Sequence, residues 1–546
     1  STWGLSIFSY FLVRSDILPK SLNYWLVLSI AEALMADDRV LRVSLKSPVV
    51  IASGSRRRLH AVAITKERRE ALLRAKRVCR VPPNFSNGEP APDDDTEDDP
   101  MEDSEEEMSQ IRIAIVDLKS SFCSQDKGVY QKRIEALRKL RRQVTKSAFH
   151  LDEAILNSEI IPSLVQCLSF GSSSEQLLES AWCLTNIAAG NPNETRSLLP
   201  SLPLLIAHLG EQSSSHVAEQ CAWAVGNVAS EGEEFRSILL SQGALPSLAR
   251  MLLPHKSSSL KTSAWTLSNL LKGPDSKAAS ELLKIEGILE ALHRHLQKDD
   301  VELVVEICWV IANLTALSRF ACTKLVNYNF LPLLVHHLAT SQCIELLIPA
   351  LRSLGNIISN ETHLFSSVLD GQEELTEGIM EVAVKCMKSK HPSLEKEAAW
   401  TMSNIAAGHV ENKRKICKGG GFGELVRLIK TAPLETRKEA GYALGNMCVD
   451  VEQEKGSIVS ECLAEVVGSG CVDGFVGLVK CADMEAATMG LQFLELVLRG
   501  MPNGEGVAVV EAQSGLQAIE MFEFHDNDDL RNMASSLIDT YFVSNG

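Results

Sequence analysis

The stretch KEAAWTMSNIAAG (396–408) places a tryptophan four residues before an asparagine, and this pair returns along the chain. The pattern, with Cys once replacing the leading Ala, occurs in five segments: AWCLTNIAAG (181–190), AWAVGNVASEG (222–232), AWTLSNLLKG (264–273), CWVIANLTAL (308–317) and AWTMSNIAAG (399–408). Two segments keep the phase without the tryptophan: LRSLGNIIS (351–359) and GYALGNMCV (441–449). The aligned asparagines are separated by 41, 42, 44, 43, 48 and 42 residues: Asn186, Asn227, Asn269, Asn313, Asn356, Asn404 and Asn446.

This spacing predicts a repeat array. A second kind of apolar segment lies upstream of the Trp segments and fits a helix whose start is marked by Gly or Pro: IIPSLVQCL (160–168), GALPSLARML (243–252), FLPLLVHHL (330–338) and GIMEVAVKCM (378–387). A unit of about three helices cannot bury its apolar faces alone, so successive units must stack. The period is typical of armadillo or HEAT arrays, which form a curved superhelix with a long concave wall.

Composition agrees with such an array. A chain of 546 residues is too long for one compact core, and 45% apolar with only 5% aromatic residues favours stacked Leu/Ala/Val-rich helices. The net charge of −16 favours basic ligands over nucleic acid, although an ordinary acidic soluble protein explains it equally well. The 14 cysteines, among them Cys183, Cys221, Cys308 and Cys343, form no CxxC pair or zinc pattern, and we interpret them as small core residues.

The chain divides into four predicted regions. Residues 1–34 begin with Ser and precede an ordinary start at Met35, so we expect an upstream extension foreign to the native protein. Residues 35–80 include a segment, 55–80, with eight Arg and two Lys against two Glu. The following 81–108 are predicted to be a disordered acidic linker, because 89–107 carry twelve Asp or Glu and no base. Residues 109–543 hold the repeats.

Tryptophan and asparagine four residues apart share one helix face, so stacking would align them into two ladders. One interpretation makes the indoles core and the amides ties between neighbouring turns. The other, which we prefer because Asn is a poor mid-helix residue, makes the amides grip an extended peptide while the indoles hold Lys or Arg stems. Acids three residues before the aromatic position would strengthen that preference for bases: Glu179, Glu306, Glu397 and Glu439.

The ladder segments, with SGLQAIEMFEFHDNDDLRNMASSLIDTYF (514–542) as an atypical last repeat, resemble importin-alpha, the adaptor for classical nuclear localisation signals. The likeness covers about residues 50 to 542. It implies an all-α, right-handed superhelical solenoid of about ten armadillo repeats, with a basic N-terminal helix ahead of the linker. It also implies a non-enzymatic protein that shuttles between cytoplasm and nucleus through the nuclear pore.

The resemblance implies a major signal-binding site, with a pocket for the key lysine at Gly190, Thr195 and Glu231, where the family usually has Asp. The full major site is Trp182, Asn186, Gly190, Thr195, Gln220, Trp223, Asn227, Glu231, Trp265, Asn269 and Glu306. A minor site for bipartite signals would use Arg352, Asn356, Glu397, Trp400, Asn404, Glu439, Tyr442 and Asn446. Arg352 agrees with the family's usual interruption, whereas Tyr442 replaces an expected Trp.

The basic segment resembles the importin-beta-binding domain of the same family. Its charged residues are Arg56, Arg57, Arg58, Lys66, Arg68, Arg69, Arg74, Lys76 and Arg77. The resemblance implies that it occupies the groove in cis until importin-beta withdraws it. From the residues alone, a nucleic-acid arm, a membrane-surface helix or a solvated helix compete with this interpretation.

The expected partners are importin-beta, basic signal-bearing cargo and, at the C-terminal repeats, the family's export receptor. We expect no nucleic acid, no membrane insertion, no cofactor and no metal. Phosphate-loop, zinc-protease and hydrolase motifs are lacking in the sequence, so we expect no catalytic residues. The alternative is a catenin-type armadillo scaffold in adhesion or signalling, with an armadillo ubiquitin ligase as a third interpretation.

Overall fold

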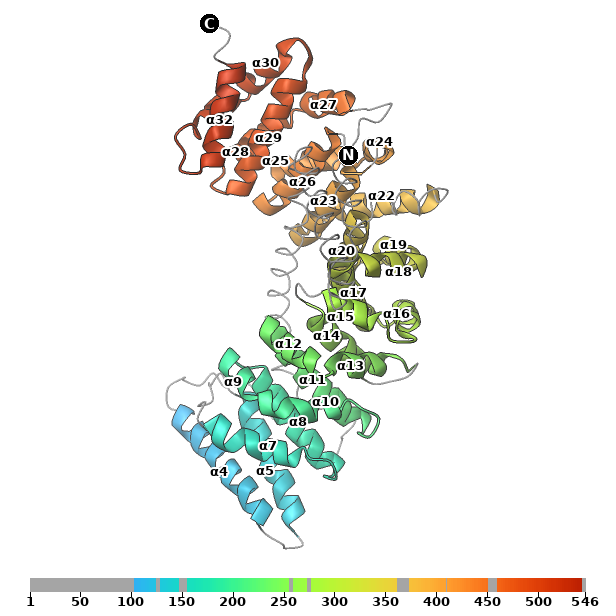
Figure 1. The fold of residues 1–546 in the computed structure, drawn as a ribbon, viewed down its shortest axis with the longest axis vertical. Coiled ribbons are helices and arrows are strands. Elements are labelled where there is room, and N and C mark those ends of the chain that lie inside the picture. Colours follow the sequence, from blue (N-terminus) through green and yellow to red (C-terminus); the bar gives the residue numbers. More distant parts are fainter. Residues whose placement is uncertain are drawn as a thin grey trace, which may run out of the picture.

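The computed structural model describes residues 103–123, 128–146, 155–254, 259–272, 276–360, 373–408, 410–449 and 459–542. Within these ranges every regular element is a helix. The helices stack in chain order along one long axis, from α4 and α5 at the bottom of Figure 1 to α30 and α32 at the top, and the stack curves. The predicted all-α armadillo solenoid is confirmed.

Each repeat ends in a third helix that contacts the third helix of the next repeat. These helices are α5 (Val129–Lys146), α8 (Ser174–Ala188), α11 (Ser215–Glu231), α14 (Leu260–Leu270), α17 (Val301–Leu317), α20 (Ile344–Asn360), α23 (Pro392–Ala406), α26 (Leu434–Met447), α29 (Met484–Gly500) and α32 (Asp528–Tyr541). The Trp/Asn segments all fall on them, so one continuous row of helices carries the ladder.

The second helices pack beneath this row, and α13, α16 and α19 lie along the convex edge in Figure 1. They are α4 (Asp103–Cys123), α7 (Ile161–Cys167) after the π-helical turn η1 (Leu156–Ile160), α10 (Leu202–Ala207) after the 3₁₀ turn η2 (Leu199–Ser201), α13 (Ala244–Leu252), α16 (Ile288–Leu296), α19 (Phe330–Thr340), α22 (Glu373–Met387), α25 (Gly421–Thr431), α28 (Val472–Val479) and α31 (Gly515–Glu520). The first helices are α9 (Pro192–Ser197), α12 (Glu233–Ser241), α15 (Ser276–Leu282), α18 (Arg319–Asn327), α24 (Val410–Lys418), α27 (Val459–Gly468) and α30 (Glu505–Ala512) after the 3₁₀ turn η3 (Pro502–Gly504).

Local sequence signals set many helix boundaries. Ser173, Ser214 and Asp300 precede third helices and accept a hydrogen bond from a first-turn amide, which satisfies a donor the helix leaves unpaired. Gly243 and Gly287 separate first from second helices with φ of +83° and +78°, a conformation that L side chains rarely adopt. The prediction that Gly or Pro marks the second helix is therefore confirmed at 243–252.

Two boundaries differ from expectation. The helix expected to start at Gly378 begins at Glu373. Gly378 therefore lies inside α22, where it packs closely: an added Cβ would stand 3.3 Å from Val335 Cγ1. The first described helix begins at Asp103, so the last residues of the segment 81–108 are helical. Acidic residues are favourable at a helix N-terminus because the helix dipole is positive there, so the acidic composition did not by itself end the helix.

Cysteine burial matches the core interpretation. Cys183, Cys221 and Cys308 are fully buried, and Cys343 is half-buried. Burial raises the pKa of the Cys386 thiol to about 11, since the thiolate is poorly solvated there. These thiols therefore act as small apolar side chains.

The predictions for residues 1–34 and 35–80, and for 81–102, lie outside the described residues. Across the described part of the chain, no single helix is both long enough and apolar enough to span a membrane. One pair of helices, 460–468 and 472–479, has sufficient length and apolar character when taken together, but the two are bent by 83°. The described residues include no group of three or more His, Cys, Asp or Glu arranged to hold a metal ion.

Histidines connect successive second helices by donating to carbonyl groups at the end of the preceding one. The Nε2 to carbonyl oxygen distances are 2.7 Å for His208 to Leu168, 2.8 Å for His295 to Leu252 and 2.7 Å for His337 to Leu296. A carbonyl only accepts, so Nε2 carries the proton in each ring. These bonds join neighbouring repeats at the convex side.

Replacing His337 with Gln should reduce the loss of folding stability that occurs as the pH is lowered. Burial, aided by His336, holds the pKa of His337 below its ordinary 6.5 despite the Leu296 hydrogen bond. The stability that neutral His337 contributes is therefore complete above the pKa that it has in the unfolded chain. This stability is lost as the pH falls through its lower pKa in the folded protein. We expect the urea midpoint to fall less in His337→Gln than in the wild type from about pH 7.5 to about pH 5. His336→Gln, at an exposed position, should keep most of the wild-type slope, and equal slopes for His337→Gln would contradict this assignment.

Candidate functional site

The ladder asparagines tie each repeat to the one before it. Six amides donate from Nδ2 to the carbonyl of the residue immediately preceding the aligned asparagine of the previous repeat. The pairs are Asn227 to Thr185 at 3.0 Å, Asn269 to Gly226 at 3.2 Å, Asn313 to Ser268 at 2.8 Å, Asn356 to Ala312 at 3.0 Å, Asn404 to Gly355 at 3.2 Å and Asn446 to Ser403 at 2.9 Å. The asparagines therefore do act as ties, but they join neighbouring repeats and not the neighbouring turns of one helix.

The same bonds fix the orientation of the amides. An amide carries two N–H groups and a carbonyl oxygen, so one donated bond does not exhaust its capacity. The side chain of Asn446 is 5% exposed, and its Oδ1 has no hydrogen-bond partner among the described residues. This oxygen is itself buried, so a donor from outside the chain would reach it only after a local rearrangement.

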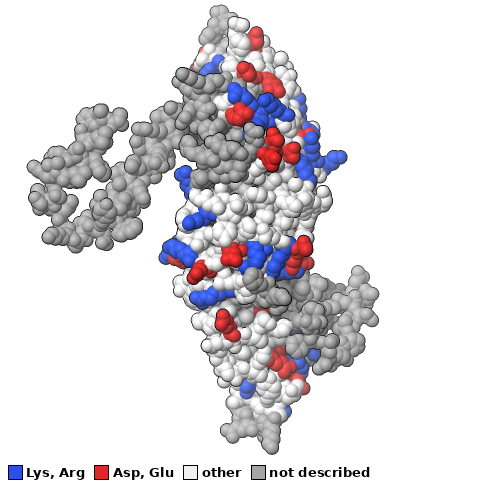
Figure 2. Space-filling view, turned by 90° about the vertical axis from the view of Figure 1, so that its right-hand side faces the viewer, with Lys and Arg blue, Asp and Glu red and all other residues white. Residues whose placement is uncertain are grey.

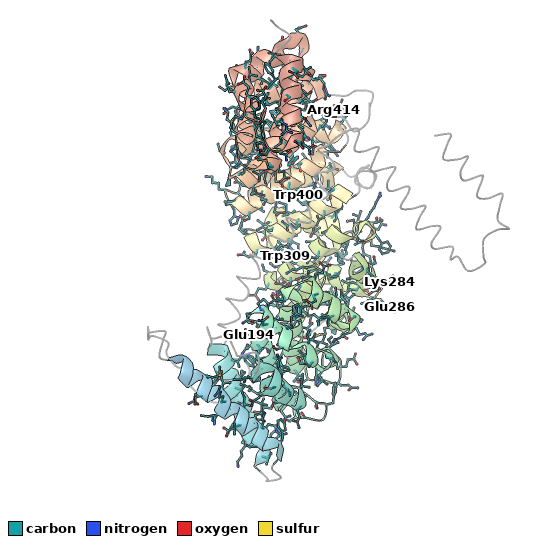
Figure 3. All side chains as sticks on the ribbon, turned by 60° about the vertical axis from the view of Figure 1, so that its left-hand side comes forward. Glu194, Lys284, Glu286, Trp309, Trp400 and Arg414 are labelled. Carbon is teal, nitrogen blue, oxygen red and sulfur yellow. The ribbon has the colours of Figure 1, made fainter. Side chains whose placement is uncertain are left out.

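The indoles lie against the preceding third helix. A Cβ built on Gly226 would stand 2.1 Å from Trp265 Cζ3, and one on Gly355 would stand 2.4 Å from Trp400 Cζ3. Trp309 is also buried, and in Figure 3 Trp309 and Trp400 lie on the side of the array that carries Glu194, with Lys284 and Glu286 at the opposite edge. Packing between repeats thus uses part of each ring.

Burial changes along the ladder. Trp182 and Trp223 are half-buried, whereas Trp265 and Trp400 are only 6% and 5% exposed. Tyr442, in the aromatic position of α26, is 4% exposed and its hydroxyl donates to Glu485 Oε1 at 3.3 Å. The first two indoles therefore present the largest part of their rings.

The predicted lysine pocket is brought together at the turn after α8. Thr195 Oγ1 lies 3.5 Å from Glu231 Oε2, at the C-terminal end of α11, and also contacts the carbonyls of Ala188 and Asn191. Carbonyl, hydroxyl and carboxylate oxygens converging in this way suit an ammonium group, which has three donors.

Glu194 belongs to this corner and was missed by the sequence reasoning. It is buried, accepts from the Asn191 backbone N–H at 2.7 Å, and its Oε2 would stand 1.8 Å from a Cβ at Gly190. A side chain at position 190 would therefore require the Glu194 carboxylate to move. The signal was present in the sequence, because Asn191-Pro-Asn-Glu194 is a capping box.

Two predicted groove acids are already paired with arginine. Glu179 accepts from Arg141 Nε at 2.7 Å and from Arg138 Nε at 3.4 Å. Glu397 is fully buried and accepts two bonds from Arg352, one from Nε at 3.1 Å. The spacing predicted that these acids lie on the ladder face, and the structure adds that an arginine of the preceding repeat already pairs with each of them.

The remaining predicted positions fall on the same helices. Gln220 Nε2 donates to Thr185 Oγ1 at 2.8 Å and so lies between α8 and α11. Glu306 is half-buried on α17, one turn before Trp309, and Glu439 is buried on α26, one turn before Tyr442. The basic residues of 55–80 lie outside the described residues.

Known proteins resemble this chain over nearly its whole length. The family model described as Armadillo/beta-catenin-like repeat matches residues 150–189 and 232–272. Importin subunit alpha-9 of Arabidopsis thaliana is 53% identical over 515 residues, which cover 93% of this chain and 98% of the relative. Importin subunit alpha-2 of Oryza sativa subsp. japonica is 48% identical over 505 residues, which cover 92% and 95%. The chain belongs to the importin-alpha family.

A solved structure supports the armadillo fold independently of these relatives. The crystal structure of an engineered protein is similar with a TM-score of 0.64 at 25% identity, covering 78% of this chain and 98% of the other. The family resemblance in the sequence is therefore confirmed, together with the armadillo fold and the assignment to nuclear import.

A buried lysine on one of the helices that carry the importin-alpha ladder was also missed. Lys438, on α26, is 7% exposed and contacts Asp483 at 3.2 Å, Glu485 at 3.3 Å and Glu435 at 2.9 Å. Although burial favours the neutral amine, these three acids hold the pKa of Lys438 well above its ordinary value. The sequence offered no signal for this cluster, because two of its acids lie in the next repeat.

Proposed function

We propose that this importin-alpha is a non-enzymatic adaptor that binds classical basic nuclear localisation signals along its Trp/Asn ladder. The observation that carries the proposal is the regular amide ladder, in which each asparagine is held by the preceding repeat. Such fixed amides offer repeated hydrogen bonds to an extended backbone at low entropic cost. The half-buried indoles supply flat surfaces for lysine and arginine side chains.

The major site is the better supported of the two proposed sites. Thr195 and Glu231 converge at one of its corners, and Trp182 and Trp223 are half-buried beside it. In the minor site Arg352 interrupts the aromatic series and pairs with Glu397, so peptide binding there would depend on Asn404, Asn446 and Trp400. We propose that the minor site holds the second basic cluster of bipartite signals.

The remaining steps follow from family membership. We propose that residues 35–80 recruit importin-beta and, without it, occupy the major site in cis. The complex would cross the nuclear pore, and the C-terminal repeats would meet the export receptor, so the protein shuttles between cytoplasm and nucleus. On the face in Figure 2, described basic and acidic side chains are interspersed, whereas nucleic acid requires a continuous basic surface.

Trp223→Ala and Asn227→Ala should each weaken binding of a Lys-Lys/Arg-x-Lys/Arg peptide by about tenfold, because they remove an indole surface and an amide contact. Fluorescence anisotropy with the full chain measures this. The matched control is Asn313→Ala, which removes an equivalent tie, to Ser268, outside both proposed sites. If Asn313→Ala lowered affinity as much as Asn227→Ala, the ladder would act through stability alone.

The same titration tests the autoinhibition. A chain lacking residues 35–80 should bind the peptide more tightly than the full chain, since a tethered segment competes at high effective concentration. Equal affinities would remove autoinhibition from the proposal and leave the groove itself intact.

A further inference from the structure

The first repeat continues the ladder with different residues. Arg138, Arg141 and Thr145 on α5 lie 41 residues before Glu179, Trp182 and Asn186, the same separation as between Asn186 and Asn227. The bond from Asn186 Nδ2 to Thr145 Oγ1, at 2.6 Å, confirms this register in space. Arg141 therefore occupies the position that tryptophan holds in the following four repeats.

Arg141 uses the groups that a basic ligand would need. Its guanidinium carbon lies 4.3 Å from the ring centroid of Trp182, and its Nε donates to Glu179 Oε2 at 2.7 Å. The side chain is 20% exposed, and that of Glu179 is 9% exposed. An indole face and a carboxylate are the two features that attract a lysine or arginine side chain, and here the chain supplies its own cation.

The other arginine in an aromatic position also pairs with an acid of the next repeat. Arg352 binds Glu397, and this acid lies three residues before Trp400, as Glu179 lies three residues before Trp182. The four consecutive indoles from Trp182 to Trp309 are therefore bounded by an arginine on each side, and each arginine is neutralised by the next repeat.

We propose that Arg141 marks the repeat-1 end of the major site and disfavours a basic peptide residue at that end. The inference rests on the proposed binding of basic peptides in this groove. Arg141 covers the α5-facing side of Trp182, satisfies Glu179 and places a cation where a further basic side chain of the peptide would lie. A bound signal must therefore finish its basic run before α5 and continue with a neutral or acidic residue.

Of the two neighbouring bases, Lys139 serves as the control because its ion pair lies away from Glu179. Arg138 contacts Glu175 at 2.6 Å, and Glu179 only at 3.4 Å. Lys139 contacts Asp117 of α4 at 3.4 Å, away from the ladder. Lys139→Ala therefore removes one positive charge from the same helix without touching Trp182 or Glu179.

The test uses three versions of one basic core peptide, extended at either end by Lys, Ser or Glu, and titrated against the full chain. For the wild type, at the one end that reaches repeat 1, we expect the Lys extension to bind about threefold to fivefold more weakly than the Glu extension, the range of a single partly exposed charge contact. In Arg141→Gln this order should reverse, because Glu179 and Trp182 become available to the added lysine. Arg141→Ala is the second variant and should show the same reversal, because Arg138 contacts Glu179 only at 3.4 Å and the face of Trp182 is uncovered.

The outcomes separate the two hypotheses. Lys139→Ala should show the wild-type order. A second outcome is that the wild type and Asn227→Ala bind the core peptide as expected while both Arg141 variants still prefer the Glu extension to the Lys extension. In that case the proposed role of Arg141 is wrong, and the proposed peptide-binding groove is unaffected. If the wild type binds none of the basic peptides, the proposed function fails and the inference fails with it.

Discussion

Gly226→Ala should destabilise the array by about 2 kcal/mol, the usual cost of overpacking a tight core. The new Cβ would stand 2.1 Å from Trp265 Cζ3 and 2.6 Å from Thr266 Oγ1, so the indole must move. Because Trp265 belongs to the proposed major site, peptide affinity should fall together with the urea midpoint. Urea unfolding followed by circular dichroism, with peptide anisotropy on the same preparations, measures both effects.

The matched control for this variant is Gly445→Ala. Gly445 precedes Asn446 as Gly226 precedes Asn227, but outside its own helix no atom of the described residues lies within 4 Å of its added Cβ. Alanine is the better helix former, so this variant should be stabilised by about 0.5 kcal/mol and bind as the wild type does. If both variants lost stability equally, the loss would come from the backbone and not from the tryptophan contact.

Glu397→Gln should destabilise the minor-site region by about 3 kcal/mol, because it removes the negative charge from a buried ion pair. Arg352 is 5% exposed and Glu397 is fully buried, so water replaces little of the lost interaction. Hydrogen exchange should show the largest loss of protection in α20 and α23, which carry the two residues. In a repeat array the effect stays near its origin, since each repeat contacts only its neighbours.

The double variant Arg352→Met/Glu397→Leu tests the physical reason. Replacing both charges with apolar side chains removes the desolvation penalty along with the attraction, so its stability should lie within about 1 kcal/mol of the wild type. If the double variant were as unstable as Glu397→Gln, the pair would contribute through packing and not through charge.

The sequence by itself determined the array, because its signals are local. The spacing of Asn186 and Asn227, the Ser173 and Ser214 caps and the glycine before α13 each lie within one repeat or at its period. Helical periodicity and capping depend on neighbouring residues, so they can be read without coordinates. The same locality identified the positions of the ladder face.

Only the tertiary structure decided what each ladder residue contacts. Glu179 and Glu397 have the same spacing to their aromatic residues as an unpaired groove acid would have, yet each binds an arginine of the preceding repeat. Each ladder amide likewise bonds one repeat back. The partners lie more than 35 residues apart in the chain and meet through the offset between stacked helices, which packing of the whole core sets and no local pattern encodes.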